Sequence, residues 1–220
     1  MSQSKRFGRR DFLILGAATL GGAAWAALRQ PAIEMDEYVC GLAANSQGKI
    51  LVTYTSRYGS TVGVASVIAE TLCKTGMAAD ARHITSVTDL SAYSAAIIGS
   101  PVNSDEWMPE AVEFVQANRS RLSQMPVAYF LTCMTLGLTD QPEAREKIAG
   151  VLQAVETQIP EVKPLEKGLF AGALDYNKMS VAMQMIYRAF AEDGTSGDFR
   201  NWDAIRAWAE ATGYKLLEKI

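Results

Sequence analysis

The chain has 220 residues and a mass of 23.9 kDa, which is enough for one sizeable domain and short for two. With 49% hydrophobic and 20% charged residues, the composition excludes wholesale disorder and collagen-like structure. The first 30 residues hold five basic side chains and one acidic one; without them 16 basic and 23 acidic residues remain, a formal charge of −7. A body this acidic lacks a surface for phosphate backbones, so we expect no nucleic-acid binding.

The amino terminus has the pattern of an export signal. Gly8-Arg9-Arg10 precedes an apolar run over residues 12–28 that is rich in Ala, Gly and Leu. A basic start before such a run is typical of signal peptides, and the paired arginines form a twin-arginine motif. We therefore predict that residues 1–30 are a twin-arginine signal, either cleaved or kept as an anchor. It would direct the protein to the periplasm or to the outer face of the cytoplasmic membrane.

Strand and helix patterns alternate through the rest of the chain. Residues 31–48 end in polar and glycine residues, so we predict a linker there and a folded domain over 49–220. Short apolar runs predict strands, and apolar residues at helical spacing predict helices. The predicted strands are 49–54, 81–84, 95–99, 127–132 and 169–174, and the predicted helices are 60–74, 108–119, 142–156, 179–190 and 202–217. This order indicates an α/β fold with an open five-stranded parallel sheet and helices on both faces.

The cysteines and the single histidine are too scattered for a zinc site. Cys40, Cys73 and Cys133 show no CxxC spacing, and His83 is the only histidine. We therefore expect no metal site and no disulfide scaffold, and we interpret Cys73, inside an apolar helical run, as a small buried side chain. His83 falls in the second predicted strand, and we expect it to lie away from the strand-end loops.

The loop after the first predicted strand has the composition of an anion site. Ligands of parallel sheets lie beyond the carboxyl ends of the strands, and the free N–H groups of a helix start bind phosphate. The loop lacks GxxxxGK[ST] and GxGxxG, so the nucleotide-hydrolase and dinucleotide fingerprints are absent and a monophosphate remains. The alternative is that its hydroxyls only cap the helix and the turn. The loop residues are Thr55, Ser56, Arg57, Tyr58, Gly59, Ser60 and Thr61.

This loop resembles the FMN phosphate loop of flavodoxins, and the order of elements over residues 49–215 is similar to the flavodoxin-like fold. The resemblance implies that the seven loop residues surround the 5′-phosphate of FMN. It also implies that two further loops flank the isoalloxazine ring. They comprise Ser100, Pro101, Val102 and Asn103 after the third strand, and Thr132, Cys133, Met134 and Thr135 after the fourth. Trp107 either stacks on the ring or starts the following helix as a hydrophobic contact.

The carboxyl-terminal part is similar to the end of the menaquinone-dependent protoporphyrinogen oxidases, which carry a helical insert after the fifth strand. The similar residues are Ala171-Gly172-Ala173-Leu174, Asp175-Tyr176, the apolar stretch 179–190, Gly194-Thr195, Asp198, Arg200 and Trp202-Asp203. The resemblance implies an FMN-dependent oxidoreductase that passes electrons from protoporphyrinogen IX to a quinone. The insert is less basic than in that family and an export signal is present, and both differences bear on the porphyrinogen more than on the flavin.

The predicted insert helix has a methionine-rich apolar face. Its residues are Met179, Ala182, Met183, Ile186, Tyr187 and Phe190. This face either makes a peripheral membrane contact, covers a hydrophobic substrate such as a quinone or a tetrapyrrole, or packs on the sheet. The alternative function is an exported flavodoxin that carries electrons to a redox protein and has no substrate of its own, since an acidic body suits basic partners. We assign no catalytic side chain, because a flavin carries the redox chemistry itself.

Overall fold

The computed structural model describes residues 28–33, 37–40, 48–190 and 196–220. The predicted export signal therefore lies outside the described residues except for its last three positions. The chain divides into a large unit, Ile33–Leu174 with Gly194–Ile220, and a small unit, Met1–Ala32 with Asp175–Asp193. Within the described ranges, no helix is long and apolar enough to cross a membrane.

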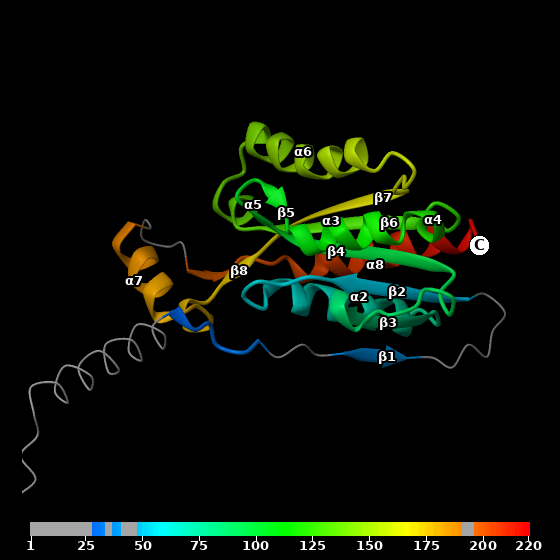
Figure 1. Ribbon diagram of the computed structural model, residues 1–220, viewed down its shortest axis with the longest axis horizontal. Coiled ribbons are helices and arrows are strands. Elements are labelled where there is room, and N and C mark those ends of the chain that lie inside the picture. Colours follow the sequence, from blue (N-terminus) through cyan, green and yellow to red (C-terminus); the bar gives the residue numbers. More distant parts are fainter. Residues whose placement is uncertain (1–27, 34–36, 41–47, 191–195) are drawn as a thin grey trace, which may run out of the picture. The chain divides into compact units, whose positions relative to one another are not determined.

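A seven-stranded sheet forms the middle of the large unit (Figure 1). Its order is β1-β3-β2-β4-β6-β7, with β5 paired to β4. The five strands from β3 to β7 in this order are parallel, whereas β1 and β5 are antiparallel to their neighbours. The strands are β1 (Tyr38–Cys40), β2 (Lys49–Tyr54), β3 (Ala78–His83), β4 (Ala95–Asn103), β5 (Glu106–Trp107), β6 (Val127–Cys133) and β7 (Glu166–Ala171). The predicted fold class is confirmed.

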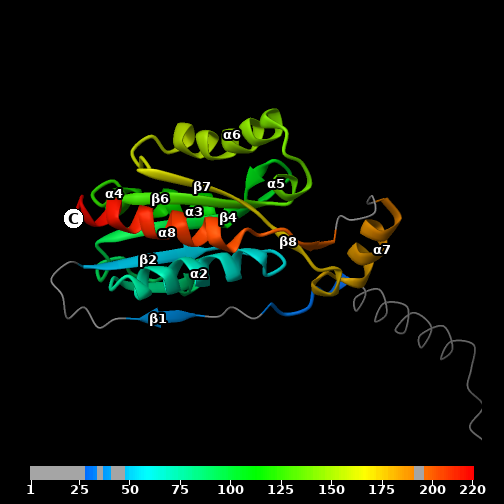
Figure 2. The same ribbon diagram turned by 180° about the vertical axis from the view of Figure 1, so that it is seen from behind.

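Helices cover both faces of this sheet (Figures 1 and 2). One face carries α2 (Ser60–Lys74) and α8 (Trp202–Leu217), and the other carries α3 (Pro109–Ala117), α4 (Arg119–Leu122) and α6 (Pro142–Gln158). Side chains alternate along each strand, so Ile50 and Val52 pack on the α2 side and Leu51 packs on the opposite side. Both faces are buried, which explains why the central strands are continuous apolar runs.

The helix α2 packs on the sheet through one apolar face. Val64, Ile68 and Leu72 recur at every fourth position, and all three are buried against the sheet. Its bounds are those predicted from the sequence, as are those of α8. At the start of α8, the Asn201 side chain accepts a hydrogen bond from the Ala204 backbone N–H at 3.0 Å, so a polar cap fixes where that helix begins.

Several predicted elements differ in extent. The strand predicted over 81–84 is β3, which begins three residues earlier and ends at His83, and the strand predicted over 127–132 and the helices predicted over 142–156 and 179–190 differ by one or two residues at one end. The strand predicted over 95–99 continues to Asn103 as β4, and the helix predicted over 108–119 is divided at Asn118 into α3 and α4. The strand predicted over 169–174 is two strands, β7 and β8 (Ala173–Leu174), and β8 pairs with β9 (Gly197–Asp198). Short helical turns are η1 (Ile84–Ser86) and α5 (Thr135–Leu138).

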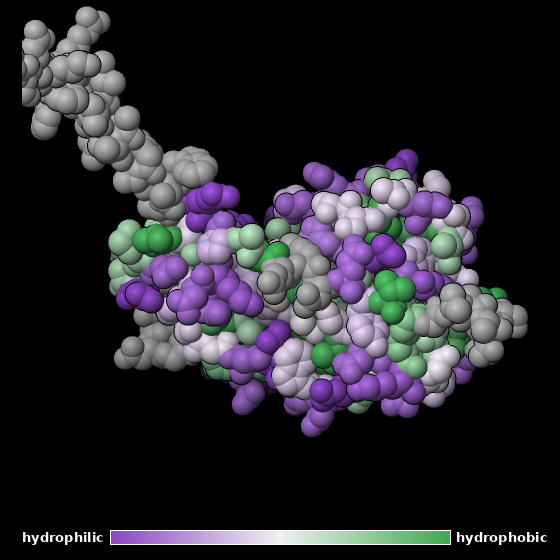
Figure 3. Space-filling model, turned by 90° about the horizontal axis from the view of Figure 1, so that it is seen from below, coloured by the Kyte–Doolittle hydropathy of each residue, from purple (hydrophilic) through white to green (hydrophobic). Residues whose placement is uncertain are grey.

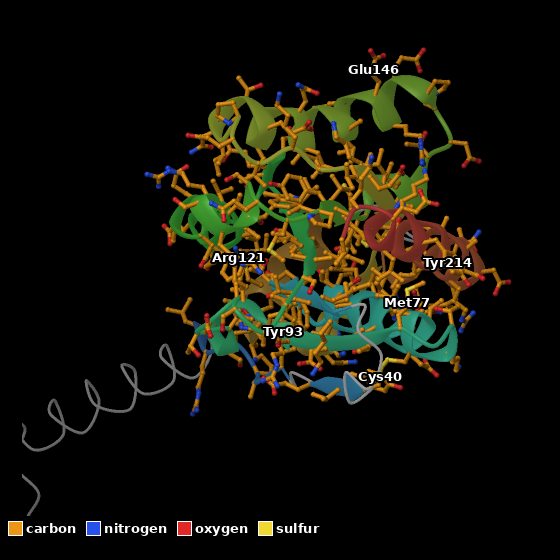
Figure 4. The ribbon with its side chains drawn as sticks, turned by 90° about the vertical axis from the view of Figure 1, so that its right-hand side faces the viewer. Cys40, Met77, Tyr93, Arg121, Glu146 and Tyr214 are labelled. Carbon is orange, nitrogen blue, oxygen red and sulfur yellow. A yellow bond between two sulfur atoms is a disulfide. The ribbon has the colours of Figure 1, made fainter. Side chains whose placement is uncertain are left out.

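The predicted linker 31–48 contains the edge strand β1. Tyr38–Cys40 pair antiparallel with Ala81–Ala79 of β3, and Glu37 forms an ion pair with Arg82 at 3.4 Å. A disulfide joins Cys40 to Cys73 near the end of α2 (Figure 4). The expectation of no disulfide and of Cys73 as a simple buried side chain is therefore wrong, because sheet pairing brings a distant cysteine beside it. Figure 3, which looks from below Figure 1, shows mostly polar side chains with hydrophobic ones between them.

The small unit contains the helix predicted over 179–190. Its described elements are η2 (Tyr176–Lys178) and α7 (Val181–Phe190). Ser180 starts α7, because its hydroxyl accepts a hydrogen bond from the Met183 N–H at 3.3 Å. Val181, Met185 and Ile186 are 53%, 60% and 50% exposed, so α7 presents large apolar side chains to its surroundings. The predicted face is corrected accordingly: it shares Ile186 with this exposed set, whereas Met179 is fully buried and Met183 is half-buried.

Removal of the Cys40–Cys73 disulfide is expected to lower the free energy of unfolding by about 2–4 kcal/mol, since the bond closes a loop with a sequence separation of 33 residues. The measurement is urea unfolding with and without a thiol reductant. A Cys40→Ser/Cys73→Ser variant serves as the control and should not respond to the reductant. An unchanged midpoint for the reduced natural chain would show that the disulfide does not stabilise the fold.

Candidate functional site

The candidate site lies where the carboxyl ends of β2, β4 and β6 meet. Thr55, the first residue after β2, donates its backbone N–H to the Gly99 carbonyl oxygen of β4 at 3.0 Å. On the other side of β4, Pro101 is in register with Thr132 of β6. The strand ends therefore bring the three predicted segments to one edge of the sheet.

The amino terminus of α2 faces this edge without a capping side chain. Gly59 precedes the helix in the left-handed conformation, with φ at 85°, and no side chain caps the helix start. A residue with a side chain would be strained there, which explains the glycine. No acidic residue occurs in the first turn of α2. The free N–H groups and the positive end of the helix dipole therefore favour an anion at this point.

Two loop hydroxyls keep their protons available. The Ser56 Oγ accepts a hydrogen bond from the Gly59 N–H at 3.0 Å, and the Ser60 Oγ accepts one from the Ala173 N–H at 2.8 Å. An oxygen that accepts from the backbone still has its own O–H to donate. These two hydroxyls are thus available as donors at the start of α2.

The other hydroxyls of the loop hold the strand ends together. Thr55 Oγ1 donates to Ser100 Oγ at 3.3 Å, and Ser100 Oγ donates in turn to the Pro101 carbonyl oxygen at 2.9 Å. Thr61 Oγ1 and Thr132 Oγ1 share a hydrogen bond of 2.9 Å between α2 and β6. All four of these side chains are buried, so their contacts connect neighbouring elements rather than face solvent.

The two segments predicted to be ring loops are largely regular structure. Val102 and Asn103 belong to β4 and pair with Trp107 and Glu106 of β5. The turn between these strands consists of Ser104 and Asp105, both with positive φ, as in the two-residue hairpins of primed type. In the second segment, Thr132 and Cys133 end β6, and Met134 and Thr135 start α5. The prediction of two open loops is corrected accordingly.

Trp107 lies in the hydrophobic core. It is 3% exposed, and its ring packs edge-on against Tyr129 at 5.1 Å between centroids. The structure thus favours the packing alternative for this tryptophan. Cys133 is also buried, in the same cluster. In contrast, Arg57 is exposed in the phosphate loop, with its guanidinium 5.9 Å from the centre of the Tyr58 ring.

His83 lies at the carboxyl end of β3, in register with Tyr54, the residue before the phosphate loop. The two rings contact edge-on at 5.7 Å between centroids. The expectation that His83 is remote from the strand ends is therefore wrong, because β3 ends one residue earlier than the predicted strand. Burial lowers the pKa of the His83 imidazole, and the Glu110 carboxylate opposes this shift.

The residues that the prediction of the site did not include come from the far end of the chain. Ala173 contacts Ser60 as described, and Arg200 Nη1 donates to the Ser60 carbonyl oxygen at 3.1 Å. No local pattern marks either residue as part of the site. A shallow hollow of about 320 Å³, lined by residues such as Met77 and Tyr214, lies at the opposite end of α2 and takes no part here (Figure 4).

Comparison with known proteins decides the family. Residues 51–198 match the family model described as the flavodoxin domain. The chain belongs to the flavodoxin domain family. It is therefore an FMN-binding flavoprotein of the redox and electron-transfer class. No match was found among curated proteins.

Similar solved structures include three flavoproteins or oxidoreductases. Flavodoxin 2 from Bacillus cereus is 18% identical, with 76% of this chain and 99% of that chain covered and a TM-score of 0.48. A putative flavoprotein from Bacteroides eggerthii is 16% identical, with 74% and 97% covered and a TM-score of 0.43. Rubredoxin oxygen:oxidoreductase from Desulfovibrio gigas is 15% identical, with 76% and 36% covered and a TM-score of 0.47, so this chain spans about a third of that protein.

The residues at the start of α2 fit the phosphate of FMN. The helix start is uncapped, its glycine allows close approach, and Ser56 and Ser60 are available as donors. These groups match a dianion that needs several N–H and O–H donors.

We expect the free energy of unfolding to fall as the pH falls below about 6.5, the usual pKa of histidine. Because burial lowers the pKa of His83 in the folded state, the unfolded state takes up a proton first, and stability is lost until the pH passes the folded pKa. As the chain has one histidine, an NMR titration reads its pKa directly. A His83→Gln variant should lose this part of the pH dependence. A measured pKa at or above 6.5 would contradict the expectation.

Proposed function

We propose that the protein is an exported FMN-dependent oxidoreductase that passes electrons from an organic substrate to a quinone. When bound, FMN supplies the redox chemistry by taking up and releasing electrons. The chain's own residues bind and orient it, and the insert Asp175–Asp193 provides the contact with a hydrophobic partner. The observation that carries the proposal is the exposed apolar face of α7 in a segment inserted between β8 and β9 of the flavodoxin domain.

The phosphate of FMN is proposed to bind at residues 55–61. Ser56 and Ser60 would each donate an O–H, since their oxygens already accept backbone hydrogen bonds. The uncapped N–H groups of α2 would supply further donors. Thr55, Thr61, Ser100 and Thr132 would hold the strand ends in place around the cofactor. The isoalloxazine ring would then lie toward the ends of β4 and β6, where Pro101–Asn103 and Met134–Thr135 are partly exposed or exposed.

The substrate class is proposed to be a tetrapyrrole, with protoporphyrinogen as the first compound to test. The support is the similarity of the carboxyl-terminal residues to the menaquinone-dependent protoporphyrinogen oxidases. The described basic residues of the insert helix and its approach are Lys178 and Arg188. Interfacial helices that bind anionic lipids usually have a Lys- and Arg-rich polar face. Because α7 and its approach have few basic residues, α7 would rely on apolar contact more than on attraction to anionic lipids.

The export proposal has support from the disulfide. Disulfides persist in oxidising compartments such as the periplasm and are rare in the cytoplasm. Cys40 and Cys73 form one in this domain, which agrees with the twin-arginine pattern of residues 1–30. Peripheral membrane contact through 179–190 would then take place at the outer face of the cytoplasmic membrane.

An exported electron carrier is the second candidate function. The observation that favours it is the formal charge of −7 on residues 31–220, which suits docking on basic redox proteins. A carrier exchanges electrons with a protein partner and needs neither substrate nor quinone. Kinetics therefore separate the two candidates.

Ser56→Ala and Ser60→Ala are each expected to weaken FMN binding about tenfold, because each removes a hydrogen bond to a charged phosphate. A Thr61→Ala/Ser60→Ala variant should also weaken it. Thr71→Val is the matched control, since the Thr71 hydroxyl donates to the Val67 carbonyl oxygen at the other end of the same helix. Dissociation constants from flavin fluorescence quenching measure the effect. Unchanged affinity in all the loop variants would remove the phosphate from this loop.

If the protein is an oxidoreductase, protoporphyrinogen added without oxygen should bleach the oxidised-flavin bands at about 375 and 450 nm. A menaquinone analogue should then restore them. Stopped-flow absorption measures both half-reactions on the purified protein. Bands that respond to neither compound but exchange electrons with a basic redox protein would favour the carrier instead.

A pair of variants tests whether the exposed apolar side chains of α7 contact the membrane. Met185→Asp/Ile186→Asp should slow reoxidation by menaquinone in lipid vesicles about tenfold or more, because two exposed apolar side chains are lost. Reoxidation by a water-soluble analogue should stay unchanged. Leu165→Asp, at a 43% exposed position of the large unit, is the control. Equal rates with vesicles for both variants would exclude α7 as the membrane contact.

A further inference from the structure

The base of the insert is bonded directly to the phosphate loop. We call this base the neck: residues 172–174 and 197–200. In it, β8 and β9 pair with Ala173 opposite Asp198, and the Phe199 N–H donates to the Gly172 carbonyl oxygen at 3.1 Å. The Gly172 N–H in turn donates to the Cys133 carbonyl oxygen at the end of β6, also at 3.1 Å. The neck is thereby fixed at the carboxyl edge of the sheet.

Ser60 accepts two hydrogen bonds from the neck, one from β8 and one from the segment that follows β9. Its hydroxyl accepts the Ala173 N–H at 2.8 Å, and its backbone carbonyl oxygen accepts Arg200 Nη1 at 3.1 Å. Ser60 is also the first residue of α2. The neck therefore fixes both the hydroxyl and the backbone of the residue at which the anion-binding end of the helix begins.

The guanidinium of Arg200 is held in one orientation. Its Nε and Nη2 atoms bind the two carboxylate oxygens of Asp198 at 2.8 and 2.7 Å, which is a bidentate pair. The hydrogen bonds from Arg200 lower the pKa of the Asp198 carboxyl. The guanidinium carbon also lies 4.3 Å from the centre of the Trp202 ring, and the Arg200 side chain is 16% exposed. Ordered in this way, Nη1 is directed at the Ser60 carbonyl oxygen.

A glycine in the first turn of α2 makes room for this arginine. A Cβ atom on Gly63 would lie 2.7 Å from Arg200 Nη1, which is too close for a non-bonded contact. Since Nη1 is the end of a flexible side chain, the guanidinium would shift away. The hydrogen bond to Ser60 therefore depends on the absence of a side chain at position 63.

The charges at the start of α2 favour an anion. A cation near a helix start opposes the helix dipole, and α2 has no acidic residue in its first turn to offset it. Asp198 neutralises Arg200 only across a partly exposed pair, since its own side chain is 45% exposed. A dianion at the helix start would interact favourably with the free N–H groups and with the guanidinium together.

We propose that Arg200 is a positioning residue for the phosphate of FMN, which acts through Ser60 from the neck of the insert. It fixes the Ser60 backbone, so that the first N–H groups of α2 and the Ser60 hydroxyl keep their orientation, and its charge adds to the attraction for the phosphate. The base of the insert is in this way part of the cofactor site. The inference rests on the proposed placement of the phosphate at residues 55–61.

The test compares FMN with riboflavin, which lacks the phosphate. The full chain is freed of flavin, and the dissociation constants of both ligands are measured by fluorescence quenching. Arg200→Gln is expected to weaken FMN about tenfold and to leave riboflavin unchanged, because Ser60 loses the hydrogen bond that fixes it for the phosphate and riboflavin has no phosphate to lose. The salt dependence of FMN affinity should become shallower as well. Arg206→Gln is the matched control, since Arg206 pairs with Asp203 on the exposed surface of α8 and should alter neither ligand.

Gly63→Ala tests the same contact without removing the arginine. Alanine favours a helix more than glycine does, which offsets the cost of displacing the end of the Arg200 side chain, so this variant is expected to fold. It should nonetheless weaken FMN and spare riboflavin, since the new methyl group displaces Nη1.

The outcomes separate the inference from the phosphate placement. An equal loss for both ligands, or no loss for FMN in either variant, would overturn the role of Arg200. If Ser56→Ala and Ser60→Ala weaken FMN selectively while Arg200→Gln and Gly63→Ala do not, the phosphate lies at the loop and Arg200 has no part in it. If none of the four variants discriminates between FMN and riboflavin, the phosphate placement fails as well.

Discussion

The uncapped start of α2 is the constraint on which the rest of the large unit depends. In a parallel sheet each helix begins where the preceding strand ends, so free N–H groups and the positive end of a helix dipole collect at one edge. Here Gly59 takes the left-handed conformation and no side chain caps the helix. The hydroxyls of Ser56 and Ser60 lie at this point, and Arg200 bonds to the Ser60 carbonyl oxygen. Such an edge is most stable when an anion occupies it, so cofactor binding also stabilises the fold.

Most of the large unit could be predicted because its signals are local. The apolar period of Val64, Ile68 and Leu72 indicates α2, and its bounds follow from the turn residues on either side. The strand β1 has no such signal, since three residues have no period and their partner is β3, about 40 positions later. The Cys40–Cys73 disulfide follows from that pairing. Cysteine connectivity depends on which strands become neighbours, and sequence spacing does not contain this information.

The composition of the site could be predicted from the sequence. Which hydroxyls would be available to a ligand and which would join neighbouring elements could not. Their number and their place after a strand indicate an anion site, and the family match supports it. Whether a hydroxyl faces a ligand or a neighbouring element depends on how the end of β2 lies beside β4 and how α2 lies on β6. Thr55 forms a hydrogen bond with Ser100, and Thr61 forms one with Thr132. Ser56 and Ser60 instead accept hydrogen bonds from backbone N–H groups. Trp107 differs for the same reason, because the hairpin at Ser104 and Asp105 turns it into the core.

The neck explains how a flavodoxin domain carries an insert without losing its cofactor site. The chain must leave the sheet after β7 and return to start α8, and β8 and β9 bring the outgoing and incoming segments together by pairing. Because the same segments contact Ser60, the geometry at α2 is independent of what lies between residues 175 and 193. The insert can therefore differ in length and polarity while the phosphate loop stays fixed. On the proposed function, the insert would meet the hydrophobic partner, and the loop held by the neck would retain the phosphate of FMN.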